Sequence, residues 1–320
     1  MPSYHLESLT SSNVGHVFAA IGLTSALESY GGCIGWKCAD APSHPTLTAD
    51  ADDEAIESAI IEAVRVLLND WQTILPQCFA RNEKKSKKQK KDDDGDQEVE
   101  SAWIGCEREA LYAVFDGLPP RLRARLAPWA SMIAVDPKDK RYTYKPRTQL
   151  SKTKFTSFFA PALLTNVVKI HEAVGILECL KFPLAYLGSM TWSDTEKTSY
   201  DVAATMKDGG KPQSTVGATM SHPLIEALIL LGIEVASLKP STRMPRSRIT
   251  RRGKTGEELV LPLWTVPLSF CEIEAHLFDT RTNECLIVPF ADNGKNIVPI
   301  VGSYGRDRKQ VKRKTNQRLA

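Results

Sequence analysis

Apolar residues recur at helical spacing in two segments near the start of the chain. Residues 13–30 open with Asn13, a favoured N-cap, and are followed by a pair of glycines, so we predict a helix there. Residues 52–71 open with two aspartates, which stabilise a helix N-terminus. The amphipathic stripe of this second helix consists of Ile56, Ile60, Ala63, Val64, Leu67 and Trp71. Short apolar runs at residues 3–9 and 32–38 predict strands.

Two further helical patterns follow in the middle of the chain. Residues 161–182 are apolar nearly all round, which is typical of a helix buried in the core. Residues 222–232 predict another helix, with Ser221 as its cap, Pro223 in its first turn and a glycine at its end. Between Trp103 and Ala134, prolines divide a helix-like pattern, so we expect short helices with corners between them.

The last quarter of the chain changes to a β pattern. Short apolar runs separated by turn residues extend from residue 259 to residue 302 and predict an antiparallel meander. The runs are LVLPLWTVPLSF, EIEAHLF, ECLIVPF and NIVPIVG. Together the patterns indicate an α+β fold with an N-terminal strand-helix unit, a central helical region and a C-terminal antiparallel sheet.

Composition divides the chain further. Residues 81–100 hold six lysines, then four aspartates and two glutamates, with one large apolar residue, so we predict a disordered insertion. It separates an N-terminal strand-helix region, residues 1–80, from residues 101–305, which hold the helical region and the sheet of the same or a second domain. Residues 306–320 have almost nothing to bury, and we expect a basic tail.

Positive charge is concentrated, although the net charge is only +3. Residues 138–154, 239–254 and 306–318 each contain seven of the 41 lysines and arginines. Clusters of this kind create local positive potential, and phosphate backbones are their commonest partner. Solvated loops are the alternative interpretation of the same clusters.

These clusters supply the candidate nucleic-acid-binding residues. Cations interleaved with aromatic rings, as in the first cluster, suit a single-strand-binding surface, although a β-hairpin with a buried aromatic face explains that cluster equally well. The candidates in the first cluster are Lys145, Arg147, Lys152, Lys154, Tyr142 and Tyr144. Those in the second cluster are Arg243, Arg246, Arg248, Arg251 and Arg252, and those in the tail are Lys312, Arg313 and Lys314.

The chain carries no recognisable catalytic motif: GxxxxGK[ST], HExxH, GxSxG and CxxC are all missing from the sequence. The seven cysteines lie mostly in apolar surroundings, so we predict reduced core residues rather than half a zinc site at Cys33, Cys38 and His44. His171 is expected to be a packed, hydrogen-bonded histidine. His16, near the start of the first helix, is a weak candidate for a general acid or base. We therefore expect no enzymatic activity, no cofactor and no metal.

Three segments resemble proteins of type I-U (also called I-G) CRISPR systems. In residues 11–28 an Asn-x-Gly turn leads into an apolar helix with Gly-Leu and then Leu-Glu. Residues 222–240 are similar to a downstream Pro-x-x-Glu-x-Leu helix with a glycine and a basic stretch, and residues 261–270 resemble the Trp-x-x-Pro-Leu strand after it. The resemblance implies a small accessory or large-subunit-like effector component that works with guide RNA and neighbouring Cas proteins, while cleavage is performed elsewhere.

Residues and resemblance together predict a non-catalytic nucleic-acid-binding subunit of a CRISPR-Cas antiviral effector ribonucleoprotein. Its expected partners are guide RNA or single-stranded DNA and other Cas proteins. Two alternatives remain: an endoribonuclease that processes CRISPR RNA, and a structural subunit whose basic loops contact acidic proteins. No apolar stretch reaches the roughly 20 residues that span a bilayer and no signal peptide is recognisable, so we expect a soluble, cytoplasmic protein without a membrane partner.

Overall fold

The computed structural model describes several stretches of the chain, which between them contain every element discussed below. They are residues 1–80, 116–123, 125, 133–135, 144–146, 161–182, 206–207, 211–212, 222–233, 238–239, 246–247, 250–252, 257–278, 284–292, 297–299 and 303–306. The predicted insertion at residues 81–100 lies outside this part of the chain, and so does the predicted tail apart from Arg306.

An antiparallel sheet contains the strands of the N-terminal region. Its order is β1 (Ser3–His5), β3 (Pro45–Thr48), β2 (Cys33–Trp36) and β12 (Leu268–Ser269). The predicted strands at residues 3–9 and 32–38 are confirmed as β1 and β2. The sequence patterns did not predict β3, nor that β12, from the last quarter of the chain, would complete this sheet.

Helix α1 (Val14–Ala26) begins where the sequence predicts but ends earlier, at Ala26 and not at the pair of glycines. The Asn13 side chain accepts a hydrogen bond from the Gly15 backbone N–H at 2.9 Å, so Asn13 is the N-cap. A 3-10 turn, η1 (Glu28–Tyr30), follows, and Gly31 closes it with a φ of 60°, a left-handed conformation that glycine adopts without strain.

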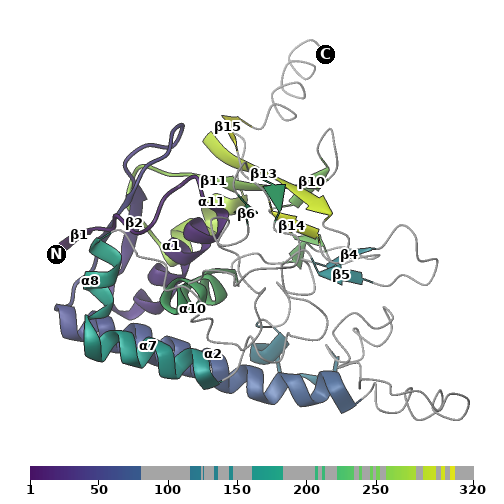
Figure 1. Cartoon of the computed structure of the whole chain (residues 1–320), viewed down its shortest axis with the longest axis horizontal. Helices are drawn as coiled ribbons and strands as arrows, with labels where there is room; N and C mark the ends of the chain where they lie inside the picture. Colours follow the sequence, from purple (N-terminus) through teal and green to yellow (C-terminus); the bar gives the residue numbers. More distant parts are fainter. Residues whose placement is uncertain are drawn as a thin grey trace, which may run out of the picture.

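Helix α10 (Pro223–Gly232) packs directly against α1 at the centre of the molecule (Figure 1). Every residue of α10 is buried, and so are the first eleven residues of α1. The two helices approach closely because each contributes a glycine, Gly22 and Gly232, at the contact. The N-cap of α10 is His222, so the prediction that Ser221 caps this helix was wrong.

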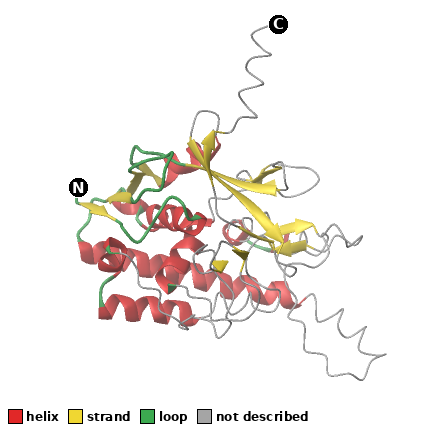
Figure 2. Cartoon of the chain, turned by 45° about the horizontal axis from the view of Figure 1, so that its top comes forward, coloured by secondary structure: helices red, strands yellow, loops and turns green. Residues whose placement is uncertain are grey.

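The long helix α2 (Asp53–Ala80) runs along one side of this pair, and α7 (Pro161–Ala173) lies beside it (Figures 1 and 2). The predicted start of α2 is confirmed, since Asp52 Oδ1 accepts a hydrogen bond from the Ala55 N–H at 2.8 Å. The prediction of one fully buried helix over residues 161–182 was wrong. Gly175, with a φ of 91°, separates α7 from a short helix α8 (Ile176–Lys181), and α7 exposes one face to solvent.

The C-terminal sheet is antiparallel, as predicted. Its order is β10 (Thr250–Arg252), β11 (Glu257–Pro262), β13 (Glu284–Asp292) and β14 (Ile297–Pro299), and β15 (Ser303–Arg306) also pairs with β13. Figure 2 shows how the long strand β13 crosses this sheet.

One predicted strand of the meander is a helix instead. The EIEAHLF run lies in α11 (Phe270–Phe278). At the start of α11, Glu272 accepts hydrogen bonds from the N–H and the hydroxyl of Ser269, at 2.8 and 2.7 Å. A serine followed three residues later by a glutamate is the capping-box pattern, which was the available sequence signal for a helix here.

Three two-stranded ribbons accompany the two sheets. They pair β4 (Ile133–Val135) with β5 (Tyr144–Pro146), β6 (Met206–Lys207) with β7 (Lys211–Pro212), and β8 (Leu238–Lys239) with β9 (Arg246–Ser247). Helices and antiparallel sheets together confirm the α+β class. A single buried cluster joins residues of the N-terminal sheet, α1, α2, α7, α10 and the C-terminal sheet.

Candidate nucleic-acid interface

The structure describes part of the predicted binding set. Tyr144 and Lys145 lie on β5, Arg246 on β9, and Arg251 and Arg252 on β10. The remaining candidates lie outside the described residues; they are Tyr142, Arg147, Lys152, Lys154, Arg243, Arg248, Lys312, Arg313 and Lys314. The β4–β5 ribbon has the antiparallel pairing that the hairpin interpretation of the first cluster requires.

Register separates the arginines of the second cluster into two groups. On β10, Arg251 lies opposite Glu258 and Arg252 opposite Glu257 of β11. Opposite charges at directly paired positions stabilise an antiparallel ladder. These two arginines therefore have acidic cross-strand positions on the sheet itself, which a count of residues 239–254 alone does not reveal.

The β8–β9 ribbon has the reverse arrangement. Lys239 lies opposite Arg246, so two like charges occupy a directly paired position, which destabilises a ladder. The β6–β7 ribbon also pairs two cations, Lys207 and Lys211, but Asp208 follows Lys207 in the sequence. Residues 239–254 contain no acid at all. Lys239 and Arg246 are thus two cations at directly paired positions, within residues 239–254 that contain no acid.

The two histidines singled out from the sequence are both held by the fold. His16 is 6% exposed, and its Nδ1 accepts a hydrogen bond from the Thr10 N–H at 3.1 Å. His171 Nδ1 lies 2.6 Å from Glu57 Oε2, which confirms a hydrogen-bonded histidine, although its side chain is about one third exposed. Glu57 also accepts the Leu177 N–H at 2.8 Å and so fixes the start of α8.

The described cysteines are free thiols, but the prediction that they are core residues was wrong for most of them. Cys285 is buried and Cys271 is exposed, while Cys33, Cys38 and Cys179 are half-buried. A hydrogen bond from Cys271 to Glu28 raises the pKa of its thiol, and burial raises the pKa of Cys33 and Cys179. Raised pKa values keep these thiols protonated and therefore poorly nucleophilic.

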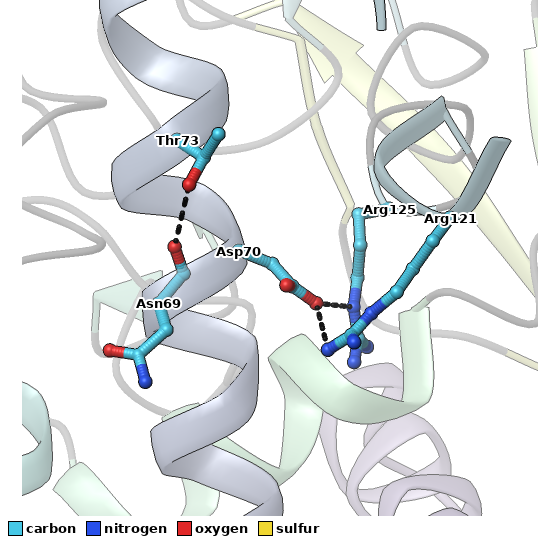
Figure 3. Close-up of polar contacts among 5 residues, drawn as sticks. All are labelled: Asn69, Asp70, Thr73, Arg121 and Arg125. Carbon is cyan, nitrogen blue, oxygen red and sulfur yellow. Dashed lines mark hydrogen bonds and ion pairs between the residues drawn. The ribbon is translucent and has the colours of Figure 1, made fainter. Parts of the chain in front are cut away.

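An arginine pair meets a buried carboxylate on α2. Asp70 Oδ2 lies 3.0 Å from Arg121 Nη2 and 3.0 Å from Arg125 Nε (Figure 3). Arg121 keeps 64% of its side chain exposed, whereas Arg125 keeps 18%. The two ion pairs hold Arg121 and Arg125, which follow the predicted insertion in the sequence, against the middle of α2.

A hollow of about 480 Å³ lies on the N-terminal sheet, next to the connection between β11 and β12. On the sheet it is lined by His5, Gly35, Trp36, Lys37 and Thr46, and on the connection by residues 265 and 267. Thr46 pairs with His5 on one side and with Gly35 on the other, so the lining crosses three strands. Sequence reasoning missed this site, because His5 and Lys37 become neighbours only through β3.

His44 is fixed beside this hollow. Its Nδ1 lies 2.7 Å from the Leu9 carbonyl oxygen and donates to it, and its ring packs edge-on to His5 with centroids 6.0 Å apart. The Lys37 N–H donates to the His44 carbonyl at 3.3 Å. These contacts hold the edge of the hollow in one arrangement.

Within the described residues, no group of three or more His, Cys, Asp and Glu side chains could hold a metal ion. In the same part of the chain, no helix has the length and apolar character to cross a membrane. The chain matches no family model, no curated protein and no solved structure.

Proposed function

We propose that this chain is a non-catalytic nucleic-acid-binding subunit of a CRISPR-Cas antiviral effector ribonucleoprotein, with guide RNA or single-stranded DNA as its ligand. The observation that carries the proposal is the pairing of Lys239 with Arg246, within residues 239–254 that contain no acid. A phosphate backbone supplies closely spaced anions, and it releases counterions when cations of this kind neutralise it.

The concentration of charge supports the same ligand. The three basic clusters hold about half of the 41 cations of a chain whose net charge is +3. Such local potential attracts a polyanion even when the average charge is small. The non-catalytic part of the proposal is supported by the burial of His16, whose Nδ1 is already engaged by the Thr10 N–H.

The CRISPR assignment rests on the three resembling segments, and the packing of the chain bears on their relation. Residues 11–28 and 222–240 contribute α1 and α10, which pack against each other. In residues 261–270, Trp264 donates from Nε1 to the Ile34 carbonyl at 2.6 Å and joins the N-terminal sheet. The resemblance therefore concerns one packed unit and not three separate stretches.

Binding is tested with two variants that remove the same number of charges. We expect Lys239→Ala with Arg246→Ala to weaken binding of a fluorescent single-stranded RNA. The slope of log affinity against log salt should fall by about 1.4, roughly 0.7 for each lost phosphate contact. Arg251→Ala with Arg252→Ala should weaken binding less, because these positions face glutamates.

Four outcomes would contradict the proposal. Wild-type protein that binds no single strand at low salt would remove it, and equal effects of the two double variants would remove the special role of Lys239 and Arg246. Cleavage of the RNA by purified protein, lost in His16→Ala, would favour the endoribonuclease. The CRISPR part is checked by sequencing the RNA that copurifies from the native cell: repeat-derived guides are expected, and unrelated cellular RNA would contradict it.

A further inference from the structure

We propose that the hollow on the N-terminal sheet binds the phosphate group of a nucleotide, at a site separate from the basic ribbons. The inference does not depend on the ribbon interface. It rests on the shape of the hollow, on the donors that line it and on the fixed arrangement of its rim.

The lining favours an anion with several acceptor oxygens. Lys37 is exposed and contributes an ammonium group, His5 contributes an imidazole and Thr46 a hydroxyl, while no acidic residue lines the hollow. An ammonium carries only donors, and a hydroxyl or imidazole can donate as well. Charge-assisted hydrogen bonds to phosphate oxygens are about twice as strong as neutral ones. A cation would find no carboxylate here, so a phosphate is the chemically matched ligand.

The size of the hollow indicates more than a bare phosphate. Its volume of about 480 Å³ falls within the range of roughly 300–1,000 Å³ typical of small-molecule sites. A phosphate beside Lys37 leaves room for an attached sugar. A nucleotide, either free or at one position of a single strand, therefore fits the space better than an inorganic ion.

One wall of the hollow depends on a glycine. A Cβ atom at Gly35 would lie 3.0 Å from the Thr265 carbonyl oxygen and 3.0 Å from the Pro267 nitrogen. Without that Cβ, the connection between β11 and β12 lies directly on the sheet. The Trp36 N–H also donates to the Trp264 carbonyl at 2.9 Å, which holds the connection in place. The hollow is thus formed by rigid backbone before any ligand arrives.

The hollow is distant from the predicted binding residues that the structure describes. Figure 1 shows β1 and β2 on one side of the molecule, and β5 and β10 on the other side, with α1 and α10 between them. A ligand in the hollow therefore contacts a different face from a strand bound along β5 and β10.

The test uses the full-length chain labelled with ¹⁵N and observes the backbone N–H signals of Gly35 and Thr46, which both line the hollow. Three probes are titrated: inorganic phosphate, a nucleoside monophosphate and a short single-stranded oligonucleotide. We expect the nucleoside monophosphate to shift the Gly35 and Thr46 signals. Lys37→Ala should weaken this binding about tenfold or more, because it removes a charged donor from the site. Lys169→Ala, which removes an exposed charge from α7, is the matched control and should bind like wild type.

The probes also distinguish the source of the nucleotide. If the oligonucleotide shifts the Gly35 and Thr46 signals with the same dependence on Lys37, the hollow accepts one position of a strand. If only the monophosphate shifts them, the hollow accepts a free nucleotide. Both results support the site. No shift with any nucleotide probe, or equal affinity in Lys37→Ala and wild type, would overturn it. The Lys239→Ala, Arg246→Ala variant should bind the monophosphate normally, so loss of the ribbon function and loss of this site remain separable.

Discussion

Replacing Gly232 by alanine should disrupt the contact at the centre of the molecule. A Cβ atom there would lie 1.8 Å from the Phe18 carbonyl oxygen and 2.8 Å from the Gly22 nitrogen, and real contacts of this kind are not found below 3.0 Å. The clash is with the backbone of α1, which no rotamer change can move. The two helices must therefore separate by more than an ångström at this point.

The expected cost follows from that separation. An overpacked core loses about 1–3 kcal/mol of stability. A gap of up to about 1 Å between packed atoms removes roughly a quarter to a half of the van der Waals energy of each contact. Alanine returns about 1 kcal/mol through its higher helix propensity. Because both helices are buried along the contact, the overpacking cost should lie near the upper end of its range, and we expect a net loss of about 2 kcal/mol in the free energy of unfolding.

Urea denaturation followed by circular dichroism measures this loss. Gly305→Ala is the control, since its Cβ would meet the Ile287 side chain at an ordinary 3.6 Å, and it should leave the midpoint nearly unchanged. Phe18→Ala should not rescue Gly232→Ala, because the clash is with the Phe18 carbonyl and not with its ring. The Gly22→Ala, Gly232→Ala double variant should lose less than the two single losses combined, since one separation serves both. An unchanged or higher midpoint for Gly232→Ala would refute the close packing of α1 on α10.

Two further predictions concern single polar contacts. Asp70→Asn should lower the free energy of unfolding by about 2 kcal/mol, because Arg121 and Arg125 both bind one buried oxygen of Asp70. Arg121→Ala should cost below about 1 kcal/mol, since that side chain is mostly exposed. Equal losses for the two variants in urea denaturation would contradict this assignment. Burial and then the hydrogen bond to Asp53 raise the pKa of Tyr4 to about 12. Because the pKa of Tyr4 is raised by folding, its contribution to stability is complete below about pH 10 and is lost as the pH rises towards 12. The urea midpoint of Tyr4→Phe should therefore decline less steeply at alkaline pH than that of wild type. An identical decline would count against the contact.

Helix caps depend on residues that lie close together in the sequence, and they were predictable from it. Asn13 caps α1 and Asp52 caps α2, because a capping side chain bonds the backbone two or three residues away and the sequence places both partners together. The start of α11 depends on an equally local pair of residues, yet this segment was predicted as a strand. Ser269 and Glu272 form a capping box in plain sequence, yet the β-like composition of the neighbouring runs made α11 look like a strand.

Features set by distant partners were not predictable from patterns. His5 meets His44 only because β1 and β3 pair, and β3 is a strand of four residues that begins with a proline. The glutamates opposite Arg251 and Arg252 likewise depend on the register of β10 with β11. The number of cations in a stretch of sequence describes the charge along the chain. Binding depends instead on which of these cations have no acidic residue at the paired position of the neighbouring strand.

The connection between β11 and β12 links the two faces to which function is assigned. β11 belongs to the C-terminal sheet, which also carries the arginines of β10, and β12 closes the N-terminal sheet beside the hollow. Between them, Trp264 exchanges hydrogen bonds with β2: its Nε1 donates to Ile34 and its carbonyl accepts from Trp36. Any change that shifts one sheet against the other must strain these buried bonds, and buried hydrogen bonds are costly to break. The two faces are therefore held at a fixed separation, as the proposed binding of nucleic acid on one side and of a nucleotide on the other requires.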